Sequence, residues 1–104
     1  MSGFARNYDT TIRDLESRLS DLVDAGKDFD FQRKGDVLEI EFSDGERVVI
    51  TPQSPLEQLW ISADFAGHRF NLKDGDWLKE KNDQPLNDFL SRTFSTHLGQ
   101  FIEL

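Results

Sequence analysis

The first quarter of the chain carries apolar side chains at intervals of three and four residues. On an α-helix such positions form one stripe, and the charged residues fall on the other faces. Gly26 comes just after the stripe, and glycine often ends helices because it adopts positive φ without strain. The pattern predicts a helix over 4–25 whose apolar stripe consists of Phe4, Tyr8, Ile12, Leu15, Leu19 and Leu22.

From residue 28 the apolar period shortens to two, which is typical of strands that bury one face. Glycine-containing turns separate most of these segments, and the clearest is Ser43-Asp44-Gly45-Glu46. We expect Phe65-Ala66-Gly67 to be another of these turns. Short turns join antiparallel neighbours. The pattern therefore predicts an antiparallel sheet of about six strands, over 28–31, 37–42, 47–51, 58–63, 68–72 and 77–79.

A helical period returns near the end of the chain. Asp83 is expected to cap this helix, Pro85 to lie in its first turn and Gly99 to end it. The apolar residues of 100–104 are expected to tuck back against the domain. The apolar stripe of this second predicted helix consists of Leu86, Phe89, Leu90, Phe94 and Leu98.

These elements predict an α+β fold. Each helix has one apolar stripe and the sheet has one clearly apolar face, so both helices should pack on that same face. The result is a two-layer α/β sandwich with the N- and C-terminal helices on one side of the antiparallel sheet. A chain of 104 residues is long enough for one such core, so we expect a single domain over 1–104.

The opposite face of the predicted sheet has one unusual feature. Pro52 and Pro55 mark a connection, and the alternation that follows places Trp60 on the polar side of its strand. Gln58 and Arg69 are expected on the same face. Tryptophan and arginine dominate many interface energies, which favours a partner-binding face over an isolated surface aromatic.

Composition narrows the classes of function. The 20 acidic residues outnumber the 12 basic ones and give a net charge of −8, which argues against nucleic-acid binding and favours cationic partners. The chain has no cysteine, so thiolate metal sites, disulfides and a cysteine-ligated cluster of its own are excluded. No secretory signal or membrane-spanning run is expected, and a bacterial cytoplasmic protein is the simplest interpretation.

Motifs for enzyme chemistry are missing from the sequence. There is no nucleophile motif, glycine-rich phosphate loop or metalloprotease motif, and His68 and His97 share no ligand spacing. We expect a strand-edge His68 and an exposed His97, and we do not expect an enzyme. Carboxylates without cysteine suit hard cations, including iron, but on composition alone a solvated helix face outweighs a metal site.

One set of residues carries a family resemblance. The stretch Pro55-x-x-Gln58-Leu59-Trp60-Ile61-Ser62, then Gly67-x-Arg69-Phe70 and then Trp77, lies between an acidic first helix and an amphipathic second one. This pattern resembles the frataxin family, and its bacterial branch most of all. The resemblance extends from the first helix to about Gly99, and the proline-to-tryptophan segment is its most specific part.

The resemblance implies the same sandwich fold and a role in iron–sulfur cluster assembly. Frataxins bind iron weakly through carboxylates and contact the cysteine desulfurase and the scaffold protein, as iron chaperone or regulator. A monomer, with oligomers that depend on metal, is also implied. By position, the implied iron ligands are Asp9, Asp14, Glu16, Asp21, Asp24, Asp28 and Asp30, and the implied partner-binding residues are Gln53, Gln58, Trp60 and Arg69.

Two departures from the family pattern affect these expectations. Thr51 stands where many relatives have asparagine, and Ser17, Ser20 and Val23 stand where bacterial relatives are often acidic. The first departure removes any hydrogen bond that the asparagine amide would make, and the second leads us to expect fewer or weaker iron sites here. The alternative hypothesis is an acidic interaction domain that binds a basic protein and has no metal role.

Overall fold

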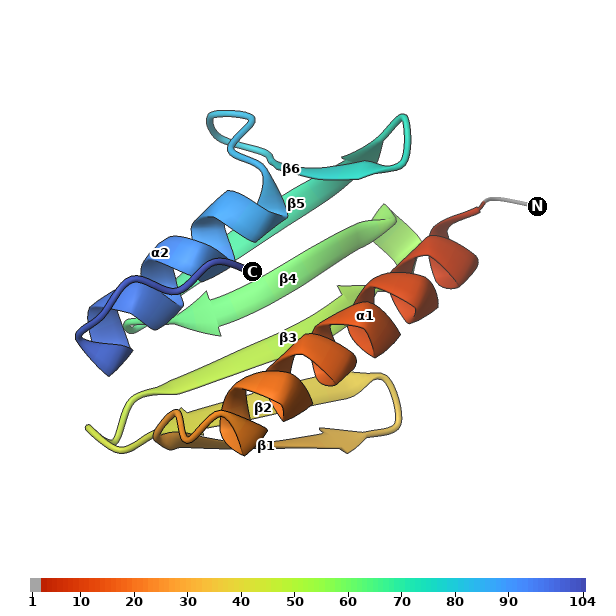
Figure 1. Ribbon diagram of the computed structural model, residues 1–104. Helices are drawn as coiled ribbons and strands as arrows, with labels where there is room; N and C mark the ends of the chain where they lie inside the picture. Colours follow the sequence, from red (N-terminus) through yellow and green to blue (C-terminus); the bar gives the residue numbers. More distant parts are fainter. Residues whose placement is uncertain (1–2) are drawn as a thin grey trace.

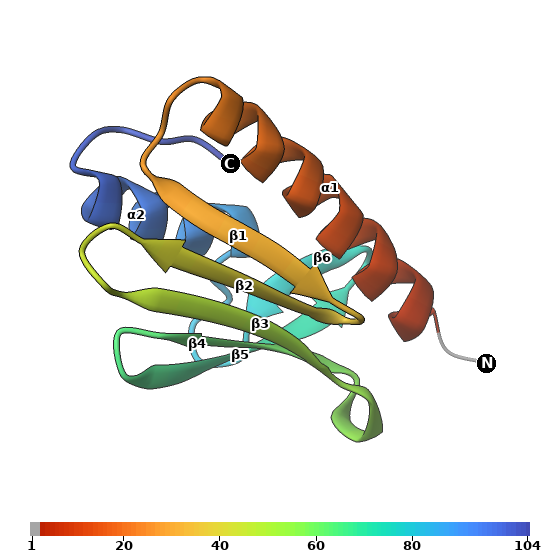
Figure 2. The same cartoon turned by 90° about the horizontal axis from the view of Figure 1, so that it is seen from below.

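The computed structural model describes residues 3–104 and shows six strands in one antiparallel sheet, in the order β1-β2-β3-β4-β5-β6. Both helices lie on one face of this sheet (Figures 1 and 2). The predicted two-layer α+β sandwich is therefore confirmed. The elements are α1 (Phe4–Asp24), β1 (Phe29–Lys34), β2 (Val37–Phe42), β3 (Arg47–Gln53), a 3-10 helix η1 (Ser54–Leu56), β4 (Gln58–Ala63), β5 (Ala66–Lys73), β6 (Asp76–Lys79) and α2 (Leu86–Leu98).

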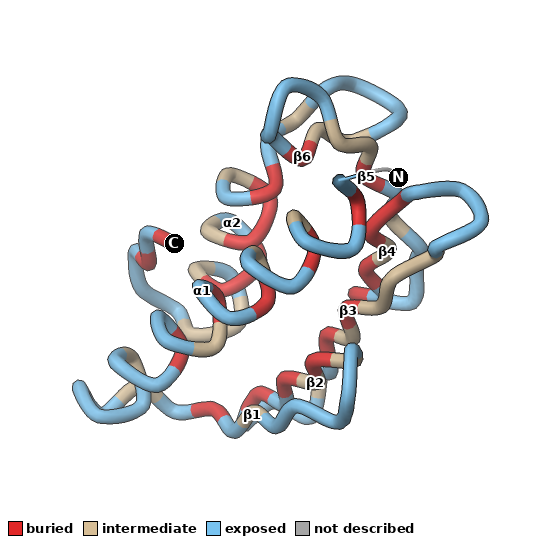
Figure 3. Tube along the Cα trace, turned by 90° about the vertical axis from the view of Figure 1, so that its right-hand side faces the viewer, coloured by how far each residue is buried: buried red, intermediate tan, exposed pale blue. Residues whose placement is uncertain are grey.

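The core lies between the helices and the apolar face of the sheet. Burial alternates along the strands, so the inward residues of β2 and β3 are buried and their neighbours are more exposed (Figure 3). Trp77 of β6 packs edge-on against Phe4, and its Nε1 donates a 2.8 Å hydrogen bond to Oγ1 of Thr11. The tail after α2 folds back in part as expected: Ile102 and Leu104 are buried, but Phe101 is 81% exposed.

Strand register determines which side chains meet on the open face of the sheet. In the β3–β4 and β4–β5 pairs, Thr51 and Arg69 lie on either side of Trp60. At the other edge of the sheet, Asp30 of β1 lies opposite Glu41 of β2. Glu41 lies opposite Arg47 in the β2–β3 pair, four residues before Thr51 on β3, so the open face has an aromatic part and an acidic part.

Two local predictions are wrong. The turn between β4 and β5 is formed by Asp64 and Phe65, with φ values of 52° and 62°, so β5 begins at Ala66 rather than at His68. Positive φ at both central residues matches the twist of a two-residue hairpin turn, and glycine usually fills the second position. Gly67 is instead an ordinary strand residue. The turn was predicted too far along the chain because glycine is a common turn residue.

The start of α2 also differs. Pro85 occupies the N-cap position, and no side chain caps the helix there. Asp83, the predicted cap, lies in the preceding loop with φ 59° and faces Lys73 at 3.4 Å. The loop is held to β6 by a 2.8 Å hydrogen bond from the Lys79 N–H to the Gln84 carbonyl, which leaves Asp83 too far back in the chain to cap α2.

Candidate functional site

The aromatic part of the open face is built around Trp60. The guanidinium carbon of Arg69 lies 4.6 Å from the centroid of the indole ring, which is cation–π geometry. The indole Nε1 donates a 2.9 Å hydrogen bond to Oε1 of Gln58. The ring is half-buried rather than fully exposed, because these neighbours cover part of it. Its position and orientation are therefore well defined.

Gln58 is more enclosed than the sequence indicated. Its residue is only 7% exposed, although it lies on the polar face of its strand with Trp60. The Nε2 group donates to Oδ1 of Asn71 at 3.1 Å and to Oε2 of Glu80 at 2.6 Å, while its oxygen accepts from Trp60. Gln53 lies opposite Gln58 in the β3–β4 register. The structure thus brings the four predicted partner-binding residues together on β3, β4 and β5.

The predicted metal ligands fall into two groups. On the exposed side of α1, Asp9 forms an ion pair with Arg13 at 2.8 Å and Glu16 forms one with Arg33 at 3.3 Å. These two carboxylates are partly neutralised by their arginines. In contrast, no salt bridge within residues 3–104 involves the exposed carboxylates of Asp14, Asp21, Asp24, Asp28 and Asp30.

The free carboxylates gather where α1 leads into β1. Asp21 and Asp24 lie in the last turns of α1, and Asp28 and Asp30 flank the buried Phe29 at the start of β1. A shallow hollow beside this segment is lined by Asp28, Asp30 and also Glu41. The sequence reasoning did not place Glu41 in the acidic group. The position of Glu41 could have been predicted from the β1–β2 hairpin. If residues 34 and 37 pair at the turn, then residues 30 and 41 pair farther along the two strands.

The acidic residues do not form a preformed metal cage. Among residues 3–104, no group of three or more His, Cys, Asp or Glu side chains is placed to hold a metal ion. Carboxylates that are near one another but not convergent can attract a hard cation without imposing a coordination geometry. The acidic end of the molecule therefore has the chemistry for weak and poorly selective cation binding.

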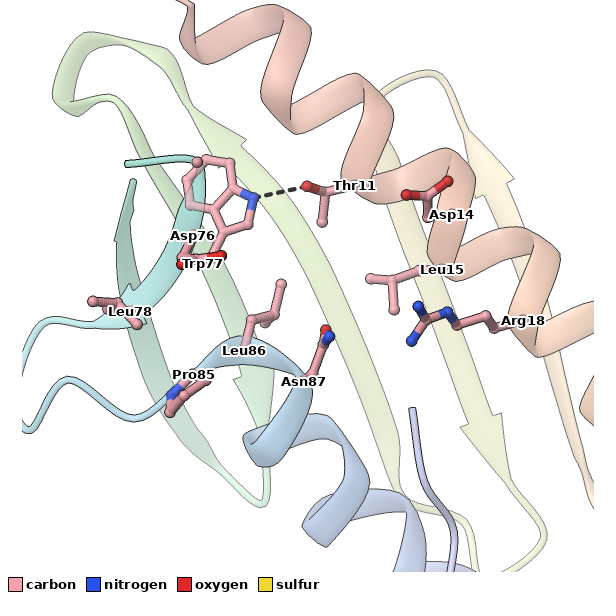
Figure 4. Close-up of a pocket in the computed structure, with 11 residues that line it drawn as sticks. Thr11, Asp14, Leu15, Arg18, Asp76, Trp77, Leu78, Pro85, Leu86 and Asn87 are labelled. Carbon is pink, nitrogen blue, oxygen red and sulfur yellow. Dashed lines mark hydrogen bonds between the residues drawn. The ribbon is translucent and has the colours of Figure 1, made fainter. Parts of the chain in front are cut away.

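A separate cleft lies between α1, β6 and the start of α2 (Figure 4). It has a volume of about 340 Å³ and an apolar floor that includes Leu15, Trp77 and Leu86. Asp14 and Arg18 project from α1 toward this cleft, so Asp14 is separated from the other free carboxylates. Among the described residues that line the cleft there is no histidine and no pair of groups arranged as nucleophile and base.

One of the two histidines differs from its predicted setting. His97 is not an exposed helix residue: its side chain is 9% exposed and contacts Asp44 and Asp64. His68 packs against the Phe89 ring, with 4.6 Å between the centroids. Burial and the nearby Lys79 ammonium group lower the pKa of His68. No helix in the described part of the chain is long and apolar enough to cross a membrane.

Comparison with known proteins identifies relatives of the chain. A family model described as a frataxin-like domain matches residues 1–100. The iron-sulfur cluster assembly protein CyaY of Paraburkholderia phymatum is 32% identical over 83 residues, which cover 80% of this chain and 79% of that protein. CyaY of Vibrio cholerae is 27% identical over 100 residues, covering 96% of this chain and 93% of the relative.

Solved structures show the same fold. Frataxin from Psychromonas ingrahamii superposes with a TM-score of 0.86 at 23% identity, covering 96% of this chain and 92% of that one. A trimeric frataxin from Saccharomyces cerevisiae, complexed with ferrous iron, gives a TM-score of 0.80 at 24% identity, with 90% and 87% covered. Together with the family model over residues 1–100, these matches show that the chain belongs to the frataxin-like family.

Proposed function

We propose that this chain is a non-enzymatic accessory protein of iron–sulfur cluster assembly that binds iron weakly and docks on the cysteine desulfurase and scaffold complex. The curated relatives named as cluster assembly proteins support this role. The structural observation that carries the proposal is the gathering of unpaired carboxylates where α1 meets β1, beside an open sheet face that presents an immobilised tryptophan.

For iron, we propose Asp21, Asp24, Asp28 and Asp30 as the main ligands, with Glu41 as an addition. The four aspartate carboxylates are exposed and carry no salt bridge within residues 3–104, so a cation does not have to displace an arginine from them. Glu41 is paired with Arg47 at 4.0 Å, which makes it a secondary ligand. Asp9, Asp14 and Glu16 contribute negative potential from farther along α1. The yeast frataxin complexed with ferrous iron supports iron as the cation.

For docking, we propose that Trp60 is the central contact and that Arg69 and Gln53 lie around it. Gln58 acts through Trp60, because its side-chain oxygen fixes the indole Nε1. A side chain that is already immobilised loses little conformational entropy on binding. The acidic end adds electrostatic attraction to basic patches on the partner. The chain is proposed to be a monomer that metal can assemble further, which the trimeric yeast relative supports.

An anaerobic NMR titration with ferrous ions tests the metal role. We expect selective broadening of amide signals over residues 21–30 and at Glu41. The double variant Asp28→Asn, Asp30→Asn should lose much of this broadening. Asp74→Asn is a matched control, because Asp74 is exposed in the β5–β6 turn with φ 52°, which asparagine tolerates.

The rival function is an acidic interaction domain without a metal role, and the lack of a three-group cage in residues 3–104 favours it. If ferrous ions broaden all signals equally, or broaden the double variant as much as the parent, the metal role is wrong. Binding to the desulfurase is then measured in metal-free buffer. If the parent and the double variant still bind the desulfurase, the rival is supported. If neither binds, the docking part of the proposal is wrong as well.

A further inference from the structure

His97 lies in the last turn of α2 and its side chain is packed against the sheet. Its ring stacks on the ring of Phe42 of β2, with 4.8 Å between centroids and 21° between planes. The side chain is 9% exposed. A polar ring so well covered needs partners for both of its nitrogens.

Both partners are carboxylates from different turns. Nδ1 lies 2.7 Å from Oδ2 of Asp44 in the β2–β3 turn, and Nε2 lies 3.0 Å from Oδ1 of Asp64 in the β4–β5 turn. Figure 1 shows both turns at the same end of the sheet as the C-terminal end of α2. One side chain therefore joins three segments that are far apart in the sequence.

The number of turns that His97 can hold depends on its protonation. A neutral imidazole has one N–H donor and one lone pair, whereas an imidazolium has two donors. An ionised carboxylate only accepts hydrogen bonds, so both contacts are hydrogen bonds only when the ring is protonated. We propose that His97 is a protonation-dependent clasp, which holds both turns on α2 as the imidazolium and releases the β4–β5 turn when it is neutral.

The geometry identifies the turn that is released. The contact to Asp44 is the shorter one, and Oδ1 of Asp44 also accepts a 2.9 Å hydrogen bond from the Glu46 N–H, which fixes that carboxylate. The Asp64 side chain is 59% exposed, compared with 43% for Asp44. Asp64 and Phe65 also hold positive φ, a strained state for a phenylalanine. The neutral ring should therefore keep its proton on Nδ1 and lose the contact to Asp64.

The charged groups around the ring set the direction of its titration. Burial lowers the pKa of His97, but hydrogen bonds and charge from Asp44 and Asp64 together outweigh it, so the pKa is raised above 6.5. These two carboxylates are the charged groups that face the ring from the two turns, and β2 contributes the uncharged Phe42. The Glu46 amide, and after it His97, lower the pKa of Asp44, which keeps that carboxylate ionised.

The sign of the pH dependence follows from this raised pKa. The folded protein binds the His97 proton more tightly than the unfolded chain does. The clasp therefore stabilises the fold fully below the unfolded-state pKa, and this stabilisation is lost as pH rises through the folded-state pKa. The lowered pKa of His68 acts in the opposite direction, so its contribution to stability increases with pH.

NMR of the unmodified protein tests the proposal without a variant. The imidazole of His97 should titrate above pH 6.5, and its ring nitrogen shifts should show the Nδ1–H tautomer at high pH. Heteronuclear NOE values at Asp64 and Phe65 should fall with the same midpoint, while the value at Asp44 stays constant. A His97 ring that titrates below 6.5, or a β4–β5 turn equally ordered at both ends of the titration, overturns the clasp.

Thermal unfolding of variants gives a second test. Between about pH 6 and pH 9, the melting temperature of the parent should fall relative to His97→Gln, by roughly 5 °C if the clasp acts at the scale of a single strong contact. His68→Gln should keep this fall and make it steeper. Asp64→Asn should lower the His97 titration midpoint, and Asp74→Asn, at a turn residue that does not contact His97, should leave it in place. Parallel pH profiles for the parent and His97→Gln overturn the proposal.

Discussion

The aromatic part of the open face and the acidic end, where α1 leads into β1, are built in different ways. Around Trp60, the Gln58 side chain bonds at once to the indole, Asn71 and Glu80. At the acidic end, Asp21, Asp24, Asp28 and Asp30 have no ion-pair partner within residues 3–104. The first region is preorganised for a shape-specific contact, and the second presents exposed aspartates without ion-pair partners. One surface can therefore recognise a partner by packing and attract it by charge.

The largest effect should come from removing the ring of Trp60. Central aromatic residues in interfaces often contribute 2 kcal/mol or more, so Trp60→Ala should weaken desulfurase binding by about 30-fold. Titration calorimetry measures this change. Phe65→Ala is the control, because Phe65 is 99% exposed at the far turn and lies outside the proposed face. Equal binding by the parent and Trp60→Ala would remove the aromatic region from the interface.

The next largest effect should come from removing Gln58, which fixes the Trp60 indole by a hydrogen bond. Gln58→Ala leaves the Trp60 N–H, the Asn71 oxygen and the Glu80 carboxylate without this partner, so unfolding free energy should fall by about 1–3 kcal/mol. The indole N–H signal of Trp60 should also shift in the NMR spectrum. Gln53→Ala, at a half-buried residue across the strand pair, should stay within about 0.5 kcal/mol of the parent. Equal loss from both variants would mean that the network around Trp60 contributes nothing of its own.

The salt dependence of desulfurase binding should distinguish the contributions of the two regions. Screening shortens the range of exposed charges from about 10 Å at 0.1 M to about 3 Å at 1 M ionic strength, so salt should weaken desulfurase binding by the parent. Asp28→Asn, Asp30→Asn should show weaker binding at low salt and a smaller dependence on salt. Trp60→Ala should keep the slope of the parent at lower affinity. The electrostatic part of the account does not survive if parent binding is the same at both salt concentrations.

The smallest effect should come from releasing a paired acid. Arg33→Gln frees the Glu16 carboxylate from its 3.3 Å ion pair, which adds one free charge beside the acidic end. Exposed pairs of this kind contribute about 0–1 kcal/mol, so the melting temperature should change little. Weak ferrous binding should increase slightly, as measured by NMR titration. Arg13→Gln, which frees Asp9 farther along α1, should change it less.

Periodicity was sufficient for the architecture. The stripe Phe4-to-Leu19 and the alternation along β2 and β3 are each buried as expected, because hydrophobic period directly reports which face is covered. The predictions were wrong where contacts between distant parts of the chain determine the local structure. Asp83 looked like a cap by residue type, but loop contacts to β6 set where α2 begins. The β4–β5 turn formed at Asp64 and Phe65 although Gly67 was nearby.

The candidate site could be predicted only as a set of residue types on faces. Gln58 was assigned to the correct face, but its burial depends on Asn71 and Glu80, which come from later in the chain. The contacts of His97 with Asp44 and Asp64 join residues 53 and 33 positions apart. A local sequence pattern cannot predict such contacts, because they form only when the two turns and the end of α2 come together in the folded protein.

The most direct test of the central claim is the rate of iron–sulfur cluster formation on the scaffold protein, followed by absorbance with the host's cysteine desulfurase, ferrous iron and this chain. We predict that the parent chain changes the rate in a concentration-dependent way and that Trp60→Ala, folded as judged by its melting curve, does not. A rate that is the same with the parent chain, with Trp60→Ala and with neither would contradict the proposed function.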